Sequence, residues 1–232
     1  MNFESVKGWI DAGMPFNSFV CGDCMEAMRE MPDNFADLCI CDPPYGLGES
    51  SKDFASRSRL ADSGRYVQKE WDNKKPNDEY FIELFRVSKK TIIWGGNYFT
   101  DNLNEQGGWI VWDKDNGEND FADCEMAWTN FGGAVRIFRW RWHGMLQQNM
   151  KYKEIRIHPT QKPVALYRWI LNKYAQAGWK ILDTHVGSAS SLIACEWEGF
   201  DYIGFEIDRE YFEAACKRMD REREKMKQMK LL

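Results

Sequence analysis

The sequence lacks the features of a secreted or membrane-inserted chain. Its 232 residues contain no apolar run that approaches the roughly 18 residues a membrane helix needs. Glu4, Lys7 and Asp11 interrupt the amino terminus, so it has no continuous apolar stretch of the kind found in signal peptides. We therefore expect a soluble, cytoplasmic protein with no membrane partner.

Cysteine is present, but not in a pattern that indicates disulfides or zinc. Seven cysteines at irregular spacing do not form the framework of a secreted disulfide-rich domain. Cys21 and Cys24, with a second pair, could be read as zinc ligands, but no knuckle glycine or His–Cys pairing accompanies them. The second pair, Cys39 and Cys41, alternates within an apparent strand, as small buried apolar residues do. We predict no metal site.

An overall excess of basic charge is also missing. The chain has 31 Lys and Arg against 36 Asp and Glu, which argues against a generally basic nucleic-acid coat. The distribution is uneven, because residues 134–163 hold seven basic side chains and one acid, Glu154. Solvated surface charge would explain such a run, and so would contact with phosphates. Interleaved aromatic residues favour nucleic acid, because bases stack on aromatic rings.

Short apolar runs that alternate with helical patterns predict an α/β fold. Strand-like runs occur at residues 19–21, 38–41, 91–94, 109–112, 125–128, 135–140, 180–182 and 202–205. Helical patterns occupy segments 25–31, 81–85 and 166–174, and a last helix starts near Arg209. This alternation indicates a mostly parallel sheet, and the strand-rich region 107–141 predicts antiparallel edge strands. We treat residues 1–232 as a single domain.

Residues 47–75 show neither a strand nor a helix pattern. Loops of this length in compact domains are usually functional lids or disordered. We predict a mobile loop there.

Acidic residues stand at the ends of several predicted strands, where open α/β sheets bind their ligands. Asp183 ends one run and is followed by a turn through Gly187. Glu206 ends the next run, 23 positions after Asp183, a spacing that suits a carboxylate bound to a ribose. The turn is too short to hold a triphosphate and has no Walker lysine. The pattern predicts a cofactor that contains a nucleoside but no phosphate tail.

A rigid group of four residues follows the run at 38–41: Asp42, Pro43, Pro44 and Tyr45. Prolines fix φ and remove backbone donors, so the strand cannot continue past Asp42. If an exocyclic amino group of a base is the substrate, Asp42 would accept one N–H and the Pro43 carbonyl another. The nitrogen lone pair would then point at an electrophilic methyl group, while Tyr45 stacks on the base. The alternative is a strand end with a structural Pro-Pro turn and a packed tyrosine.

Together these motifs resemble the S-adenosylmethionine-dependent DNA amino-methyltransferases of the beta group. Residues 42–45 match the family's catalytic D-P-P-Y, and residues 158–163, HPTQKP, match its specific cofactor-side string. ILDTHVGSASS resembles the D-P-F-x-G-S-G-T cofactor loop, and GFEID the ribose-binding strand. The catalytic motif precedes the cofactor loop, as in beta-group enzymes, including those of phages and prophages. The resemblance spans about residues 19–219 and implies a permuted, Rossmann-like sheet of seven strands.

The resemblance implies S-adenosylmethionine as cofactor. The expected cofactor-binding residues are Asp23, Asp42, His158, Thr160, Lys162, Asp183, Thr184, Gly187, Ser188 and Glu206. Glu206 would bind the ribose hydroxyls, and Lys162 would lie with Thr160 at the amino-acid end. Thr184-His185 replaces the family's Pro-Phe, and Ala189 replaces its second loop glycine, a residue that would be strained at positive φ. We expect altered cofactor affinity from these departures, not its loss.

The implied function is methylation of the 6-amino group of an adenine flipped out of double-stranded DNA. The loop 47–75 would close over the base, and residues 134–157 would form a short DNA-recognition insertion. The expected DNA-binding residues are Arg136, Arg139, Arg141, Lys151, Lys153 and Arg156. A homodimer and a cognate restriction enzyme remain open as partners.

Other targets remain as alternatives. No Pro-Cys dipeptide exists to supply the thiolate that methylation of a cytosine ring carbon needs. Methylation of the cytosine 4-amino group needs the same acceptors, but that family more often has Ser in place of Asp42. Enzymes that act on RNA or on protein glutamine usually have Asn there. An inactive DNA-binding relic is the alternative of another class.

Overall fold

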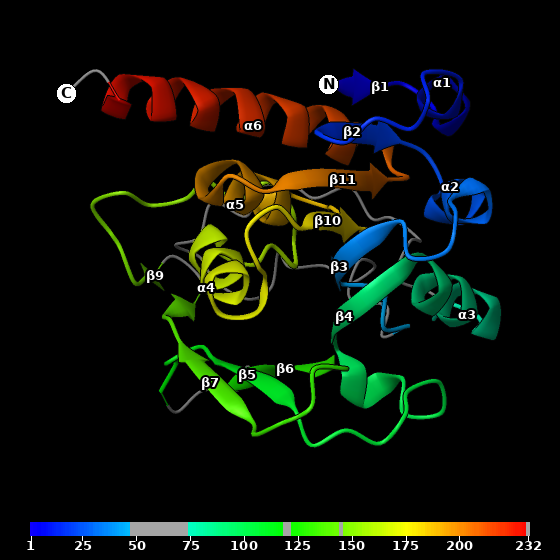
Figure 1. Cartoon of the computed structure of the whole chain (residues 1–232). Coiled ribbons are helices and arrows are strands. Elements are labelled where there is room, and N and C mark those ends of the chain that lie inside the picture. The colour runs from blue at the N-terminus through cyan, green and yellow to red at the C-terminus, as the bar shows by residue number, and fades with distance from the viewer. Residues whose placement is uncertain (47–73, 118–121, 144–145, 231–232) are drawn as a thin grey trace.

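The computed structural model describes residues 1–46, 74–117, 122–143 and 146–230, which form a nine-stranded sheet flanked by helices (Figure 1). The strand order is β1-β2-β11-β10-β3-β4-β6-β5-β7. The strands are β1 (Asn2–Phe3), β2 (Ser18–Cys21), β3 (Ala36–Cys41), β4 (Ser88–Trp94), β5 (Trp109–Asp113), β6 (Cys124–Thr129), β7 (Arg136–Arg139), β10 (Lys180–Asp183) and β11 (Asp201–Glu206). A separate ribbon pairs β8 (Trp142–His143) with β9 (Leu146–Gln147). Most of the loop predicted at 47–75 lies outside the described residues.

The direction of the strands confirms the predicted α/β fold with a mostly parallel sheet. Within the described sheet, β6 is antiparallel to both of its neighbours, β4 and β5. The other adjacent strands pair in parallel, and β7 is parallel to β5. The antiparallel element is therefore β6, which lies inside the sheet, and not the edge strands that the sequence predicted.

The described sheet has two strands more than the seven that the resemblance implies. All eight apolar runs named from the sequence form strands, and β7 corresponds to the run at 135–140. β7 extends one edge of the sheet beyond β5, and β1 extends the other edge beyond β2. β1 has two residues, which is too short for an alternating pattern to be recognised in the sequence.

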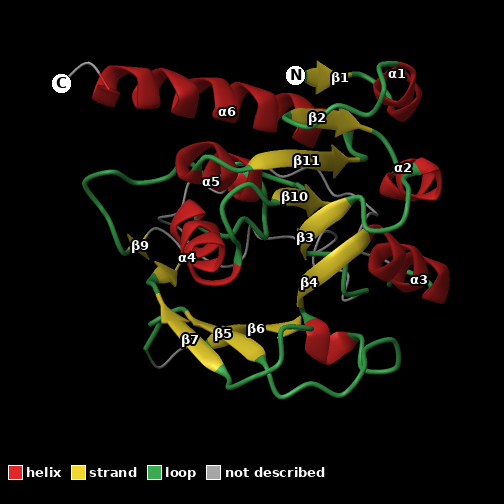
Figure 2. Cartoon of the chain, viewed as in Figure 1, coloured by secondary structure: helices red, strands yellow, loops and turns green. Residues whose placement is uncertain are grey.

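Helices cover both faces of the sheet (Figure 1, Figure 2). One face carries α4 (Val164–Tyr174), α5 (Ser190–Glu198) and α6 (Arg209–Lys230), and the other carries α1 (Val6–Asp11), α2 (Cys24–Glu30) and α3 (Asp78–Val87). Side chains of β3 alternate between the two layers, as strand geometry requires. Leu38 and Ile40 belong to the apolar cluster under α4 and α5, whereas Cys39 and Cys41 belong to the cluster under α2 and α3.

The ends of the helices follow from local chemistry. Asn77 Oδ1 accepts the Tyr80 N–H at 3.1 Å and caps α3. The short helix α1 was not predicted, because six residues give too little periodicity. Its Trp9 is fully buried, and the indole N–H donates to the Pro15 carbonyl at 3.0 Å.

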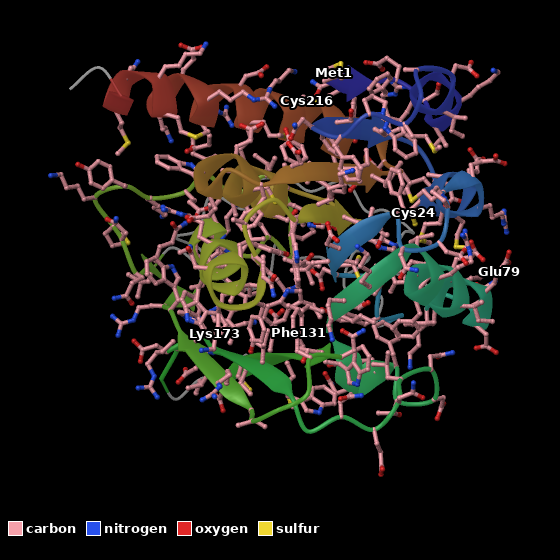
Figure 3. The ribbon with its side chains drawn as sticks, viewed as in Figure 1. Met1, Cys24, Glu79, Phe131, Lys173 and Cys216 are labelled. Atoms are coloured by element: carbon pink, nitrogen blue, oxygen red, sulfur yellow. The ribbon has the colours of Figure 1, made fainter. Side chains whose placement is uncertain are left out.

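Five of the seven cysteines are buried, whereas Cys216 is half-buried and Cys124 is exposed. All seven are free thiols. Cys24 on α2 and Cys216 on α6, both labelled in Figure 3, pack into the clusters on opposite faces of the sheet. In the part of the chain that the structure describes, no group of three or more His, Cys, Asp or Glu is placed to hold a metal ion. No helix among these residues is long and apolar enough to cross a membrane.

Candidate active site

Acidic side chains gather at the carboxyl edge of the sheet. β11, β10 and β3 are adjacent and parallel, so they end on the same side. Glu206 is the last residue of β11, Asp183 is the last residue of β10, and Asp42 follows β3. Asp23 follows β2, the next strand in the sheet, where its carboxylate caps α2 by accepting the Met25 N–H at 2.8 Å. The fold thus brings to one edge the four acids that the sequence places at strand ends.

Glu206 is held by backbone donors. Its Oε2 accepts the Gly187 N–H and its Oε1 the Asp208 N–H, both at 2.8 Å. The residue is only 9% exposed, and burial raises the pKa of the Glu206 carboxyl to about 7 although these two donors lower it. A carboxyl that is oriented and half ionised near neutral pH can accept hydrogen bonds from a diol.

Asp183 fixes the turn that follows β10. The Ser191 hydroxyl donates to Oδ2, and the His185 N–H donates to Oδ1 at 2.9 Å. Burial raises the pKa of the Asp183 carboxyl to about 7, against the effect of these hydrogen bonds. The side chain therefore spans the start of the turn and the first residues of α5.

Thr184 and His185 form a hydrogen-bonded chain with α3. The Thr184 hydroxyl lies 2.8 Å from the Tyr80 hydroxyl and 2.9 Å from His185 Nδ1. Burial lowers the pKa of His185 to about 4, so the ring is neutral at physiological pH. Tyr80 was not predicted from the sequence as part of this edge.

The turn between β10 and α5 uses left-handed backbone at two positions. Gly187 has a φ of +53° and Ala189, the cap of α5, a φ of +64°. The sequence predicted strain at Ala189 if its φ were positive, and the structure shows that it is. A left-handed alanine costs about 1 kcal/mol relative to the usual conformations.

The His158 ring packs against the turn between β10 and α5. A Cβ at Gly187 would lie 3.6 Å from the His158 ring, so the ring lies directly against the turn. His158 also packs edge-on against Tyr211 of α6, with ring centres 4.4 Å apart. Thr160, an exposed residue, lies with its hydroxyl 3.1 Å from His158 Nδ1.

Arg218 of α6 anchors the turn, although nothing in the sequence pointed to it. The side chain is almost fully buried, and it donates to the Ser188 carbonyl at 2.6 Å and to Ser190 Oγ at 2.9 Å. The Ser188 hydroxyl itself lies 3.1 Å from the Ser190 hydroxyl. Arg218 also pairs with Glu154 at 2.6 Å, which ties the turn to the predicted DNA-recognition insertion.

Both carboxylate oxygens of Asp42 accept hydrogen bonds from side chains of the site. The Tyr45 hydroxyl donates to Oδ1, and the Lys162 ammonium donates to Oδ2 at 2.5 Å. Lys162 was expected at the amino-acid end of a cofactor, and the structure places its ammonium on Asp42. The segment 158–163 therefore contacts the Gly187 turn through His158 and Asp42 through Lys162.

The Tyr45 ring is held in a close aromatic contact. It stacks on Tyr98, with ring centres 4.9 Å apart and planes inclined by 21°. Gly95 makes room for it, since a Cβ at that position would lie 2.1 Å from Tyr45 Cε1. Pro43 is buried and Pro44 is half-buried, so the four-residue group is packed as a unit.

Glu125 on β6 is a member of the site that sequence reasoning missed. Its carboxylate lies 3.0 Å from Lys162 Nζ and 2.7 Å from Lys114 Nζ. Burial would raise the pKa of Glu125, but the two ammonium groups outweigh it and lower that pKa to about 2. A glutamate within an otherwise apolar strand was the available signal.

The six basic residues predicted to contact DNA lie in three kinds of environment. Three are exposed on the surface: Arg136, Lys151 and Lys153. Arg139 pairs with Asp113 of β5 at 2.8 Å and Arg141 with Asp115 after β5 at 2.5 Å, although about half or more of each arginine side chain stays exposed. Arg156 packs over the Trp142 ring, 4.7 Å from its centre. The exposed group is thus the part of the insertion most available to phosphates.

A cavity of about 390 Å³ lies at the opposite side of the sheet, near the start of β11. Its polar groups bond to one another, since the Tyr202 hydroxyl and Arg223 each donate to Glu196 at 2.6 Å. None of the site residues predicted from the sequence lines this cavity.

Comparison with known proteins identifies relatives along most of the chain. The profile of a family described as DNA methylase matches residues 89–217, more than half of the sequence. The Type II methyltransferase M.HpaI of Haemophilus parainfluenzae is 26% identical over 88% of this chain and 74% of its own length.

Solved structures share the fold. The M1.HpyAVI–SAM complex has a TM-score of 0.53 at 20% identity and covers 86% of this chain and 98% of its own. The PvuII DNA methyltransferase, described as cytosine-N4-specific, has a TM-score of 0.56 at 14% identity and covers 92% of this chain and 86% of its own. At these identities the two likenesses show the fold alone.

Proposed function

The chain belongs to the family of N6 and N4 DNA methylases, and on this premise we propose that it methylates the 6-amino group of a flipped adenine in double-stranded DNA with S-adenosylmethionine. The observation that carries the proposal is the place of Asp42. It stands at the carboxyl edge of the sheet, at the head of a D-P-P-Y motif and in the same row as Asp183 and Glu206. In this proposal Asp42 is the acceptor for amine protons and lies beside the binding site of the cofactor's nucleoside.

The residues beside Gly187 fit the cofactor. Glu206 presents a buried carboxylate oriented by backbone N–H groups, as a ribose diol requires. The turn from Thr184 to Ser188 is short and carries no lysine, which suits a nucleoside without phosphates. When bound, S-adenosylmethionine supplies an electrophilic methyl group. Asp23, His158 and Thr160 would surround the remaining parts of the nucleoside and its amino-acid end.

Asp42 would orient the substrate amine. In the free protein Oδ1 accepts the Tyr45 hydroxyl, so an entering amine N–H replaces that donor. Lys162 keeps Oδ2 and fixes the carboxylate plane. The Pro43 carbonyl would accept the second N–H, and the Tyr45 ring would stack on the base, which orients the nitrogen lone pair before reaction. The proton that the amine loses on methylation leaves through Asp42.

The acidic first residue of the motif supports adenine over cytosine. Cytosine 4-amino methylation remains the second candidate, because the PvuII enzyme of the same fold is described as specific for that base. Both amines would be bound by the same acceptors, so the geometry at Asp42 supports an amino-methyltransferase of either kind.

Residues 134–157 would contact the DNA. Their exposed basic side chains suit phosphates, and Tyr152 is 71% exposed beside Lys151, where it could stack on a base. A second subunit sharing the site, the loop 47–75 closing over the base and a cognate restriction enzyme belong to this proposal as expectations.

The test is to incubate the protein with labelled S-adenosylmethionine and unmethylated DNA, digest the DNA to nucleosides and identify the labelled base. Label in 6-methyladenine is expected. Label in 4-methylcytosine would replace adenine by the second candidate, and label in neither base would reject a DNA methyltransferase and leave the inactive relic.

A further inference from the structure

Four charged side chains of alternating sign form a row that ends at Asp42. Lys114 Nζ lies 2.7 Å from Glu125 Oε1. Lys162 Nζ lies 3.0 Å from Glu125 Oε2 and 2.5 Å from Asp42 Oδ2. The residues come from the end of β5, from β6, from the segment before α4 and from the end of β3. The tertiary fold, and not local sequence, aligns them.

Lys162 is the most enclosed of the four. Its side chain is 2% exposed, and its ammonium lies 5.3 Å from the centre of the Trp94 ring. An ammonium so far from water requires paired carboxylates, and an unpaired buried charge is strongly unfavourable. If Asp42 were the only partner of Lys162, the charge of Lys162 would be neutralised by the same carboxylate that must accept hydrogen bonds from the substrate amine. Glu125 supplies a second partner, and Lys114 balances the charge of Glu125.

We propose that Glu125 is a positioning residue that shares Lys162 with Asp42 and thereby keeps Asp42 a strong hydrogen-bond acceptor for the substrate amine. The inference rests on the proposed function, since it concerns the same carboxylate. Glu125 does not contact the reacting atoms and acts through Lys162.

The charged and titratable groups that face Asp42 come from several elements: Lys162 before α4, Tyr45 after β3, Glu125 on β6, Tyr167 on α4 and Asp183 on β10. Burial raises the pKa of Asp42, Lys162 lowers it, and the negative charge of Glu125 raises it again. Removal of the charge of Glu125 should therefore lower that pKa. Removal of the charge of Lys114, which partly offsets Glu125, should raise it.

The size of the effect follows from the contacts. The nearest oxygens of Glu125 and Asp42 are at most about 5.5 Å apart, because both contact Lys162 Nζ. Two unit charges at that distance and an effective dielectric constant of about 20 shift a titration by about two pH units. Partial exposure of both carboxylates reduces this to roughly one pH unit. Lys114 is farther from Asp42, and its removal should give a smaller shift of opposite sign.

The first experiment measures Asp42 directly in the protein without DNA. Carboxyl-detected NMR of ¹³C-labelled aspartate gives its titration midpoint, with the resonance assigned by its loss in Asp42→Asn. Glu125→Gln should lower the midpoint by about one pH unit, and Lys114→Met should raise it. Glu79→Gln is the matched control, because Glu79 is an exposed partner of Arg29 on the outside of α3 (Figure 3). It should leave the midpoint unchanged.

The second experiment follows kcat against pH for the same variants. The acid limb should move with the NMR midpoint, to lower pH in Glu125→Gln and to higher pH in Lys114→Met. At high pH, kcat of Glu125→Gln should fall by roughly threefold, because lost basicity is partly expressed in the rate. KM for DNA should change little.

A purely structural Glu125 gives a different result. Unchanged midpoints, or shifts of the same sign in both variants, would overturn the inference even if kcat falls. If the wild-type protein methylates no DNA, the proposed function fails, while the NMR titration still decides whether Glu125 and Lys114 control Asp42. The comparison of the Asp42 midpoints in Glu125→Gln and Lys114→Met also holds if one variant is less stable. Partial unfolding would not shift the midpoint measured on the resonance of the folded protein.

Discussion

Binding of S-adenosylmethionine should weaken as the pH falls below 7, because Glu206 must be ionised to accept hydrogen bonds from ribose hydroxyls. Burial raises the pKa of Glu206 to about 7 in the free protein. About half of the molecules are then ionised at pH 7 and roughly one in eleven at pH 6. Kd should therefore be roughly tenfold higher at pH 6 than at pH 8, a loss of about 1.4 kcal/mol.

Isothermal titration calorimetry at pH 6, 7 and 8 and constant ionic strength measures this change. Glu206→Gln is the matched control, because the amide has the same shape but cannot ionise. Titration of the cofactor's own amino group and of Asp183 remains in the variant. The ratio of the wild-type to the variant Kd at each pH isolates Glu206, and that ratio should change roughly tenfold between pH 6 and pH 8.

The sign of the effect is fixed by linkage. Binding favours the ionised carboxylate, so affinity rises with pH through the pKa of free Glu206 and levels off above it. A ratio that stays constant across the three pH values would show that Glu206 does not bind the ribose as an anion.

Three further predictions concern stability and DNA. Burial raises the pKa of Asp183 to about 7, so the folded chain keeps a proton that the unfolded chain releases near pH 4, and stability falls as pH rises between these values. In urea titrations, the free energy of unfolding should fall between pH 4.5 and pH 7.5 by on the order of 3 kcal/mol more in the wild-type protein than in Asp183→Asn. An equal fall in both proteins would contradict the raised pKa of Asp183. Arg218→Met should destabilise the protein by roughly 3 kcal/mol in urea unfolding, because Glu154 loses its buried partner; a loss below about 1 kcal/mol would refute the anchoring role. Lys153→Ala should weaken DNA binding equally on all sequences in fluorescence anisotropy and reduce the salt slope by about one, whereas a loss confined to one sequence would argue against a phosphate contact.

The strands, and the acidic residues at their carboxyl ends, could be predicted because both depend on local sequence pattern. Apolar runs flanked by polar residues located every long strand, and the rule that ligands lie at the carboxyl ends of parallel strands placed Asp42, Asp183 and Glu206 at one edge. The unusual residue Ala189 was recognised from motif comparison, and its left-handed φ bears out the concern about strain.

Contacts between distant segments could not be predicted in the same way. Lys162 and Asp42 are 120 positions apart, and the composition of HPTQKP does not show which carboxylate the lysine reaches. Arg218 lies on a helix rich in charged residues, so nothing in its spacing separates it from its solvated neighbours. Glu125 carried a signal, a charge inside an apolar strand, but its partners, Lys114 and Lys162, come from two other parts of the chain.

The most direct test of the central claim is the amount of label that wild-type protein and Asp42→Asn transfer from S-adenosylmethionine to unmethylated DNA. Asp42→Asn keeps the size of the side chain but weakens its ability to accept a proton. We expect 6-methyladenine with the wild-type protein, and at least a hundredfold slower transfer by a variant that still binds S-adenosylmethionine, on the order of the usual loss for an essential proton acceptor. Equal transfer by both proteins would contradict it.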